Sequence, residues 1–555
     1  MAVLRVRGAK IERYFDTQLA AAIWHGGSAE NFSLETLGEK LGFPKMDLRQ
    51  VLIDKGKLDP KADKGAEYYD STPEMEEYLH HDLRATLATF FHYLELYSTD
   101  ELAWKYLLNI EIPYVENIVE MQSGTLIDRE KLTDIQAALE DDLSESWEAL
   151  QAVLGSTGVF IQHEGQTWLP DPTKKGTVDR GEAGRKVAGV WQYSHCVLRP
   201  YAPSNITDNI YILKKAYGWE PADKTKAGNE KLDKHILEKL AGSGNEFAKY
   251  VLEYRELYKL SNTFVDGIND ATDPHTNILY PEYCAVCTRT HRLSSRNPNL
   301  QNLPARSKTA SKVRELFTVA DDYVLAVADL DRIEAVLLGW WLLQLNEPDD
   351  RLSKVFIDRV DLHQTNADSW RISRFLAKTV LYLLMYGGGA LRLSISAGIS
   401  LEEAEKVFAS VNEGMPALLT LKEWVAEIAT QNDGVIHDPL GNRYTIPELL
   451  SSQKWERAKG ERLSFSYVNQ GFAGSIFKEL QVRLRSELIR QGVRAKQLLQ
   501  VHDEVVYSVH KDDVVRFKEI GDSIFTTMDI LTTEGQYAIP VSGEFNTGKT
   551  WLEAK

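Results

Sequence analysis

The sequence has little cysteine and no long apolar run, and both absences narrow the classes of protein to which it can belong. Only three cysteines occur in 555 residues: Cys196, Cys284 and Cys287. The last two form a lone C-x-x-C without a second pair, which argues against zinc. No run reaches the roughly 18 apolar residues of a membrane helix, and residues 1–16 lack the apolar block of a signal peptide. These features predict a cytoplasmic protein that does not span a membrane.

The chain also lacks a positive charge balance. Its formal net charge is −17, which argues against binding of polyanions by the whole surface. A local basic groove stays compatible with that value, because affinity for nucleic acid depends on the cations that face the phosphates. With 43% hydrophobic and 26% charged residues over 555 positions, the composition predicts a globular protein of several domains.

The segment from Arg374 to Gly387 is the most informative part of the chain. Arg374, Lys378 and Tyr382 follow one another at four-residue intervals. Each such step drifts by only about 40° on an α-helix, so the three side chains share one stripe roughly 12 Å long. Two cations followed by an aromatic ring suit a nucleoside triphosphate. A surface helix with two ordinary cations and a core tyrosine is the alternative.

Two aspartates lie where apolar strands are expected to end. Asp329 follows the apolar run 323–328, and Asp503 lies at the tip of a predicted hairpin between 497–501 and 505–509. Carboxylates at such positions need a cation, and two brought together need a divalent ion between them. Mg²⁺ binds a few carboxylates together with water and substrate phosphates. Otherwise Asp329 is a helix N-cap and Asp503 a turn former.

Three motifs in order resemble those of family A DNA polymerases, and the resemblance covers about residue 100 to the end. They are Asp329-Leu-Asp-Arg-Ile-Glu334, Arg374-x3-Lys378-x3-Tyr382-x3-Tyr386-Gly387 and Gln500-Val-His-Asp-Glu504. Flanking matches include Arg292-Leu-Ser-Ser and Pro298-Asn-Leu-Gln-Asn-Leu-Pro304. The resemblance implies extension of a primer 3′-hydroxyl with dNTPs by a two-metal mechanism, with Mg²⁺ as the ions and Mn²⁺ as a substitute.

The resemblance assigns a role to each matching position. Asp329 and Asp503 are the expected catalytic metal ligands, with Glu504 as an accessory ligand. Lys378 is also a candidate proton donor to the leaving pyrophosphate. The other dNTP-binding candidates are Arg374, Tyr382, Glu334, His363 and Tyr386. The expected primer-template contacts are Arg292, Arg462, Gln470, His502 and the cations Lys249, Arg255 and Lys259 of a helix at 245–262.

The resemblance also implies a multidomain α/β (α+β) fold of right-hand shape, with palm, fingers and thumb and an antiparallel palm sheet surrounded by helices. We expect a partial 3′–5′ exonuclease-like region at 1–105, the thumb and connecting segments at 106–270, and the first part of the palm at 271–360. The fingers are expected at 361–455, with helical residues at 361–389. The second part of the palm is expected at 456–555.

The N-terminal region departs from the family pattern. Tyr78-x3-Asp82 resembles the last motif of the proofreading exonuclease, but the Asp-x-Glu pair that opens that domain has no counterpart. Two-metal hydrolysis needs several carboxylates, so we predict that this chain alone does not proofread. A separate exonuclease polypeptide that docks here, or a processivity factor, stays open as a partner.

Three functions remain in competition at this point. The leading one is a DNA-templated DNA polymerase in phage replication, located in the host cytoplasm if the protein is viral, with primer-template DNA and dNTPs as partners. A single-subunit RNA polymerase shares the palm, but Glu334 and Glu504 favour DNA. A catalytically inactive nucleic-acid-binding subunit is the third, and the presence of both aspartates argues against it.

Overall fold

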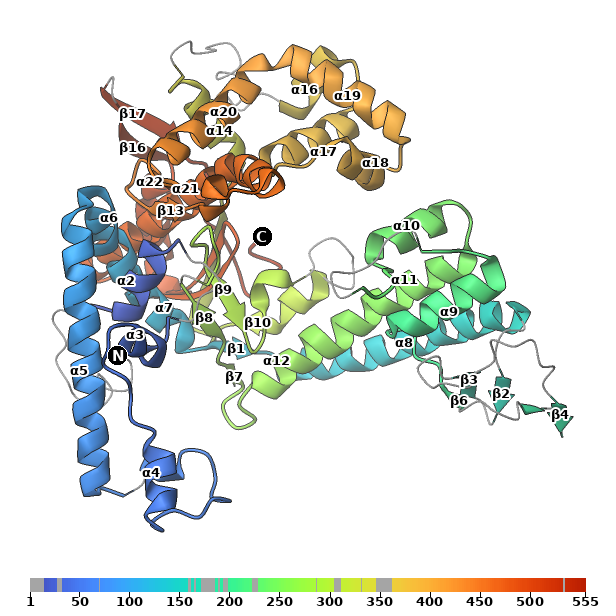
Figure 1. Cartoon of the computed structure of the whole chain (residues 1–555), viewed down its shortest axis with the longest axis horizontal. Coiled ribbons are helices and arrows are strands. Elements are labelled where there is room, and N and C mark those ends of the chain that lie inside the picture. Colours follow the sequence, from blue (N-terminus) through green and yellow to red (C-terminus); the bar gives the residue numbers. More distant parts are fainter. Residues whose placement is uncertain are drawn as a thin grey trace.

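The computed structural model describes the chain from Tyr14 to Lys555, and helices predominate in it (Figure 1). The described residues exclude 27–31, 69, 158–160, 164–165, 171–184, 188–189, 193–197, 222–227, 286, 304–310, 331, 346–361 and 533–534. Among them, no helix is long and apolar enough to cross a membrane.

A four-stranded antiparallel sheet lies at the centre of the molecule, in the order β14-β15-β11-β18. Its strands are β14 (Ala495–Val501), β15 (Glu504–His510), β11 (Tyr323–Asp329) and β18 (Asn546–Gly548). Alternate residues of a strand face opposite sides, so Ala326 and Ala328 enter one buried cluster while Leu325 and Val327 enter another. Burial on both faces explains why the strand reads as a continuous apolar run.

Helices cover one face of this sheet. The longest is α21 (Lys454–Arg490), and α14 (Ile333–Leu342), α20 (Pro416–Gln431) and α22 (Val514–Ile524) pack around it. Every residue of α14 is buried, as its apolar sequence requires. The strands β16 (Thr527–Thr532) and β17 (Gly535–Pro540) form a separate hairpin beside these helices.

A helical lobe (residues 362–414) stands above the sheet in Figure 1. It contains α16 (Leu362–Trp370), α17 (Arg374–Met385), α18 (Ala390–Ala397) and α19 (Leu401–Gly414). Most of the segment 361–389, which was expected to be helical, is thus helical, and a break at Arg371 divides it into α16 and α17. Arg371 has a φ of 56°, which a continuous α-helix does not allow, and the Ser373 side chain then accepts a hydrogen bond from the Leu376 N–H as the N-cap of α17.

A long helical arm (residues 129–271) extends to the right in Figure 1, below the helical lobe. Its helices are α8 (Arg129–Thr157), α9 (Ile206–Tyr217), α10 (Lys234–Gly242), α11 (Glu246–Lys259) and α12 (Asp266–Ala271). They enclose a core of their own, with Leu213, Phe247 and Val251 fully buried. The described residues between α8 and α9 carry β2 (Ile161–His163), β3 (Gln166–Pro170), β4 (Arg185–Val187), β5 (Val190–Gln192) and β6 (Leu198–Pro200).

The N-terminal part packs against the other side of the sheet and is almost entirely helical. Its elements are α2 (Thr17–Trp24), α3 (Leu34–Lys40), α4 (Leu48–Asp54), α5 (Pro73–Ser98), α6 (Glu101–Tyr106) and α7 (Ile112–Gln122). The helix α5 buries Tyr93 and Tyr97 against α2.

Short elements complete the described structure. The strands are β1 (Thr125–Ile127), β7 (Ile278–Leu279), β8 (Glu282–Cys284), β9 (Ser294–Arg296), β10 (Phe317–Thr318), β12 (Val435–His437) and β13 (Arg443–Thr445). The 3₁₀ and π-helical turns are η1 (Ala66–Tyr68), η2 (Leu107–Glu111), η3 (Leu260–Val265), η4 (Leu300–Asn302), η5 (Val313–Leu316), η6 (Pro447–Leu450) and η7 (Lys511–Asp513).

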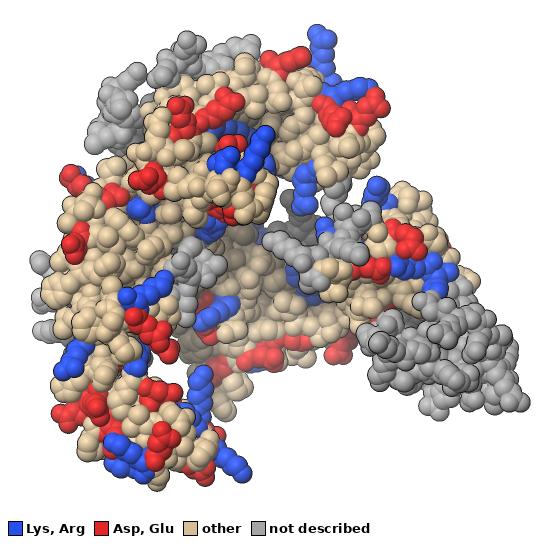
Figure 2. Space-filling model, in the orientation of Figure 1, with Lys and Arg blue, Asp and Glu red and all other residues tan. Residues whose placement is uncertain are grey.

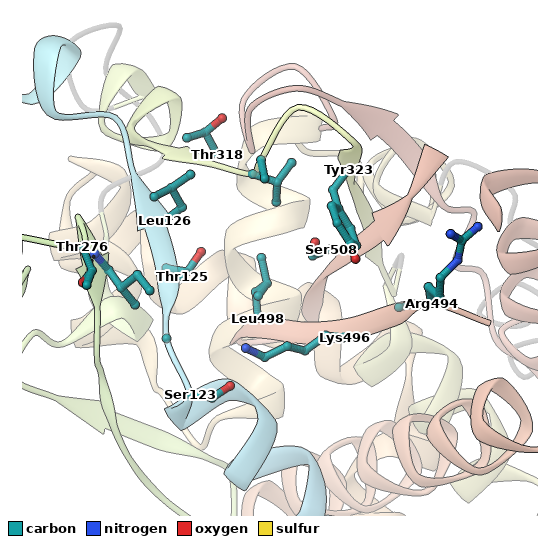
Figure 3. A pocket seen from close by; sticks show the side chains of 15 residues that line it. Ser123, Thr125, Leu126, Thr276, Thr318, Tyr323, Arg494, Lys496, Leu498 and Ser508 are labelled. Atoms are coloured by element: carbon teal, nitrogen blue, oxygen red, sulfur yellow. Dashed lines mark hydrogen bonds between the residues drawn. The ribbon is translucent and has the colours of Figure 1, made fainter. Parts of the chain in front are cut away.

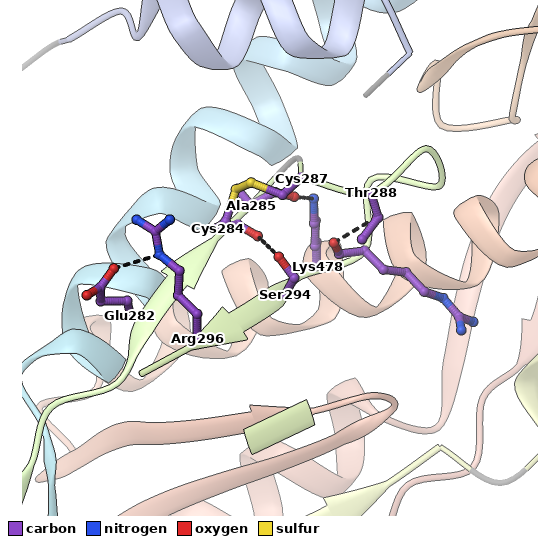
Figure 4. Close-up of a disulfide and its surroundings, with 9 residues drawn as sticks. Glu282, Cys284, Ala285, Cys287, Thr288, Ser294, Arg296 and Lys478 are labelled. Atoms are coloured by element: carbon purple, nitrogen blue, oxygen red, sulfur yellow. Dashed lines mark hydrogen bonds and ion pairs between the residues drawn. A yellow bond between two sulfur atoms is a disulfide. The ribbon is translucent and has the colours of Figure 1, made fainter. Parts of the chain in front are cut away.

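The lone C-x-x-C motif forms a disulfide between Cys284 and Cys287, at the end of β8 (Figure 4). Cys287 is exposed and Cys284 is half-buried. The intervening Ala285 carbonyl accepts a hydrogen bond of 3.4 Å from the Lys478 ammonium on α21. The pair therefore fastens the start of the loop that joins β8 to β9.

A buried ion pair joins the N-terminal part to α21. Lys478 Nζ lies 2.6 Å from Glu111 Oε1, with side-chain exposures of 2% and 0%. The Tyr106 hydroxyl donates a further hydrogen bond of 2.9 Å to Glu111. Because a buried charge without a partner is strongly unfavourable, each member of this pair depends on the other.

We expect the substitution Lys478→Met to lower the free energy of unfolding by about 3–5 kcal/mol, because it leaves the Glu111 carboxylate buried without a cation. The matched control is Lys406→Met, which removes an exposed pair with Glu402 on α19 and should cost less than about 0.5 kcal/mol. Urea denaturation followed by circular dichroism measures both. Equal midpoints for the two variants would contradict this view of the pair.

Candidate active site

The sheet brings Asp329 and Asp503 together at one of its ends. The strands β11 and β15 pair along their whole length, so that Asp329 lies opposite Glu504. The Leu330 N–H donates a hydrogen bond of 3.0 Å to the Asp503 carbonyl. Asp329 thus ends β11, and Asp503 lies in the hairpin turn directly before β15, at the same end of the sheet. Asp329 does not cap the following helix, because the N-cap of α14 is Arg332.

The surroundings of Asp503 favour a bound cation. Burial raises the pKa of this carboxyl group, and the nearby Glu334 acts in the same direction. Arg292, whose guanidinium lies 3.9 Å from Asp503, opposes the shift. Among the described residues, no three His, Cys, Asp or Glu side chains are arranged to hold a metal ion. Two aspartates still fit Mg²⁺, which takes its remaining ligands from water and substrate phosphates.

Glu504 does not have the free carboxylate expected of an accessory metal ligand. Its side chain is only 4% exposed. One carboxylate oxygen accepts a hydrogen bond of 2.5 Å from the Trp551 indole, and the other pairs with Lys555. A ligand role would require both contacts to break, which the sequence motif alone could not reveal. Asp331, the other acidic residue of the first motif, lies outside the described residues.

Arg292, Glu334 and Tyr386 form a polar network beside the two aspartates. The Arg292 guanidinium contacts one oxygen of the Glu334 carboxylate, and the Tyr386 hydroxyl donates to the other. Glu334 is 8% exposed, and burial together with this carboxylate raises the pKa of Tyr386. Arg292, expected to contact DNA, is therefore engaged within the site. Asn469, which sequence reasoning missed, donates a hydrogen bond of 3.1 Å to the Glu334 carbonyl.

The helix α17 presents its cations beside its buried face. Ala377, Val380, Leu381 and Leu384 are buried at helical spacing, whereas Arg374 and Lys378 are exposed. The described residues show no ion pair for Lys378.

Aromatic rings continue the exposed face of α17 towards the polar network. The Tyr382 ring stacks on that of Tyr386 with centroids 6.0 Å apart, and the His363 ring lies 6.1 Å from Tyr382. His363 is nearly buried, whereas Tyr386 is 39% exposed. The predicted dNTP-binding residues of α16 and α17 are thus neighbours of one another.

Three of the expected primer-template contacts surround the same site. Gln470, on α21, accepts a hydrogen bond of 3.2 Å from Arg292 through its carbonyl. Arg462 is exposed on α21, and its carbonyl would lie 2.7 Å from a Cβ atom placed on Gly387. His502 occupies the hairpin turn with a φ of 54°.

The turn that carries His502 is held by glutamines. The His502 N–H donates a hydrogen bond of 2.8 Å to the Gln301 side chain, whose amide donates in turn to the Gln500 carbonyl at 2.6 Å. The Tyr114 hydroxyl contacts the Gln500 side chain. Gln301 belongs to the Pro298–Pro304 segment, which matched the family pattern in the sequence. The sequence did not indicate that this glutamine holds the hairpin turn.

The three cations of α11 differ in their position around the helix and in their exposure. Lys249 and Arg255 are six positions apart, which places them about 120° apart around the helix. Arg255 is half-buried, and one of its guanidinium nitrogens is fully buried. Lys249 and Lys259 are exposed. The expected contact of these three cations with primer-template DNA stays a prediction.

Tyr78 and Asp82 lie on α5, where the tyrosine-aspartate motif predicted a helix. Lys45 Nζ lies 3.2 Å from Asp82 and 3.2 Å from the Tyr78 hydroxyl. The contacts with both groups raise the pKa of Lys45 against the effect of its burial. A lysine thus neutralises Asp82, and the described residues gather no further carboxylates into a metal-binding group there.

Charge is unevenly distributed over the face shown in Figure 2. Blue side chains gather around the hollow between the helical lobe and the helical arm, while red ones line the lower edge, where α8 lies. This segregation is compatible with a net charge of −17 and with a polyanion in the hollow.

Comparison with known proteins identifies relatives of this arrangement. The family model described as DNA polymerase family A matches residues 203–553. The thermostable DNA polymerase I of Thermus thermophilus is 31% identical over 357 residues, which is 62% of this chain and 41% of that protein. DNA polymerase I of Rhizobium leguminosarum is 26% identical over 496 residues, which is 82% of this chain and 47% of that protein. This chain thus spans less than half the length of these relatives.

A solved structure shows the same fold. The POL domain of Pol1 from M. smegmatis, in complex with DNA primer-template and dNTP, superposes with a TM-score of 0.74 at 22% identity and covers 97% of this chain and 82% of its own. This likeness confirms the predicted multidomain α/β fold with an antiparallel sheet surrounded by helices. Because the family model spans well over half of the chain and includes both aspartates and α17, the chain belongs to DNA polymerase family A.

Proposed function

We propose that this chain is a DNA-templated DNA polymerase that extends a primer 3′-hydroxyl with dNTPs. One observation carries the proposal: Asp329 at the end of β11 and Asp503 in the turn before β15 lie at the same end of the sheet, and Arg292 joins Asp503 to the Glu334–Tyr386 network that leads to α17. Family membership and the relatives named DNA polymerase I support it. We assign the helical arm to the thumb, the helical lobe to the fingers and the central sheet to the palm, within the domain boundaries expected from the sequence.

Asp329 and Asp503 would hold two Mg²⁺ ions, with Mn²⁺ as a substitute. When bound, such ions lower the pKa of an attacking hydroxyl and stabilise the charge of an in-line phosphoryl transfer. Arg374 and Lys378 would bind the triphosphate, because two exposed cations on one helical face match its length. Lys378 would also give a proton to the leaving pyrophosphate. Burial raises the pKa of Asp503, and the nearby Arg292 acts against that rise by favouring the charged carboxylate.

The stacked Tyr382 and Tyr386 rings provide the surface on which the incoming base and sugar would rest. Glu334 lies beneath them, and its two carboxylate oxygens are fixed by Arg292 and Tyr386. A side chain held from both sides cannot easily move aside for a 2′-hydroxyl. This rigidity favours a DNA polymerase over the RNA polymerase alternative.

The first prediction concerns the two aspartates. Asp329→Asn and Asp503→Asn should each reduce primer extension by at least about 10³-fold, equivalent to about 4 kcal/mol of transition-state stabilisation, because a neutral amide binds Mg²⁺ poorly. Asp321→Asn, at the exposed start of the same strand region, should change nothing. Gel-shift binding to primer-template should persist in all three. Unchanged extension by Asp329→Asn would exclude the site, whereas no extension by the unmodified protein would favour the inactive-subunit alternative.

The second prediction concerns sugar selection. Glu334→Ala should raise the ratio of rNTP to dNTP incorporation by about 10- to 200-fold, because it opens space beneath the sugar. Tyr386→Phe, which keeps the ring and removes the hydroxyl that fixes Glu334, should give a smaller increase. Single-nucleotide extension assays with each triphosphate measure the ratio. Efficient extension by the unmodified protein with rNTPs would instead support the RNA polymerase reading.

The third prediction concerns proofreading. The purified chain with Mg²⁺ should not excise a mismatched, 3′-labelled primer terminus, because Asp82 is paired with Lys45 and lacks companion carboxylates among the described residues. Extension of a matched primer by the same preparation is the positive control. Excision that disappears in Asp82→Ala would refute the prediction, since it would show that Asp82 belongs to a working nuclease site.

A separate polypeptide remains our proposal for the source of the absent exonuclease carboxylates. The same helix that carries Tyr78 and Asp82 exposes a stripe of apolar side chains at four-residue spacing, each 50–60% exposed: Leu79, Leu83, Leu87 and Phe91. An exposed apolar patch of this kind more often marks a contact surface for another molecule than a surface that stays in solvent. A processivity factor, and a role in phage genome replication in the host cytoplasm, are further parts of the proposal that rest on the sequence pattern alone.

A further inference from the structure

A second cleft lies at the end of the central sheet remote from the two aspartates. Its volume is about 510 Å³, and it opens between β1 and the strands β14, β15 and β11 (Figure 3). Tyr323 lines it at the start of β11, whereas Asp329 ends that strand. Six residues of strand separate them, which corresponds to about 20 Å. The cleft is therefore not part of the proposed polymerase site.

The floor of the cleft carries a cation without a counter-ion. Lys496 on β14 lies directly opposite Ser508 on β15, so their side chains share one face of the sheet. The described residues show neither a hydrogen bond nor an ion pair for the Lys496 ammonium. The acidic residue whose charge acts on the pKa of Lys496 is Glu120. Its carboxylate accepts hydrogen bonds from Arg485 at 2.7 Å and from the Gln497 N–H at 3.3 Å. Burial lowers the pKa of Lys496 accordingly.

Hydroxyl groups accompany this lysine. In Figure 3, the Lys496 ammonium extends towards Ser123 and Thr125, while Ser508 and Tyr323 lie together further along the floor. Within the described part of the chain, Thr125, Ser508 and Tyr323 have no hydroxyl partner. A half-buried ammonium with several hydroxyl donors forms a set of groups that suits a tetrahedral oxyanion.

The other basic side chain of the cleft serves a structural purpose. The Arg494 guanidinium is bound to Asp513 at 2.8 Å and to Asp512 at 3.0 Å. These contacts raise the pKa of Arg494 and lower that of Asp513 to about 2. Arg494 is thus neutralised within the fold, and Lys496 remains as the cation available to a ligand.

The cleft has room for more than one oxyanion. Its volume falls in the range of small-molecule sites, about 300–1,000 Å³, and a phosphate group occupies only a fraction of it. Apolar side chains of Leu126, Ile278, Val319 and Leu498 line the remainder. We propose that this cleft binds a small phosphomonoester of nucleoside monophosphate size, with the phosphate on Lys496 and the organic body against the apolar wall.

The test uses the full-length protein, free of DNA and with EDTA, titrated with dAMP in an isothermal calorimeter. We expect saturable binding that weakens by about 10- to 100-fold in Lys496→Met, because a charge-assisted contact is lost. Ser508→Ala, a smaller change in the same cleft, should weaken binding by a lesser factor. Lys378→Met should leave this binding unchanged, because it alters only α17. Primer extension by Lys496→Met should equal that of the unmodified protein.

Three outcomes would overturn the proposal. They are no binding of dAMP, equal binding by the unmodified protein and Lys496→Met, or a loss of binding in Lys378→Met that matches the loss in Lys496→Met. Titration with inorganic phosphate tests the second half of the proposal. Weaker binding of phosphate than of dAMP supports an organic body in the cleft, whereas equal affinity refutes it.

Discussion

The antiparallel pairing of β11 with β15 is the constraint on which the candidate active site depends. Asp329 and Asp503 are 174 positions apart in the sequence, and only the register of this pair brings them to the same end of the sheet. A slip by one residue would turn every side chain of the strand to the opposite face. Because β11 is buried on both faces, such a slip would disrupt two cores at once, so the packing of the whole centre fixes the aspartates.

A second constraint joins the sheet to the helical lobe. Glu334 lies in the first turn of the fully buried α14. Its carboxylate contacts Arg292, from the loop between β8 and β9, through one oxygen and Tyr386, at the end of α17, through the other. Three segments distant in sequence thus meet at one nearly buried acidic group. Its cost of burial is offset because both oxygens have partners. The same network that orders the site also links the position of α17 to that of the aspartates.

The sequence was most informative where a periodic pattern had a physical cause. The strand before Asp329, the hairpin around Asp503 and the cationic face of α17 follow from apolar runs and four-residue spacing, and the structure contains all three. Contacts made only by folding could not be foreseen. The engagement of Glu504 by Trp551 and Lys555 depends on the C-terminal turn returning to the hairpin. The break at Arg371 depends on one residue with a positive φ, and Lys45 had no signal that would pair it with Asp82.

Gly387 is the point at which the end of α17 in the helical lobe packs directly against α21. Its φ of 73° ends α17, and its lack of a side chain lets the chain press against the Arg462 carbonyl of α21, where a Cβ atom would lie only 2.7 Å away. Arg374 lies at the other end of this helix, about 18 Å distant at 1.5 Å per residue. A tilt of about 10° about Gly387 would move Arg374 by roughly 3 Å, the difference between touching a phosphate and missing it. A small tilt of α17 about this one glycine would therefore decide whether the Arg374 guanidinium contacts a phosphate.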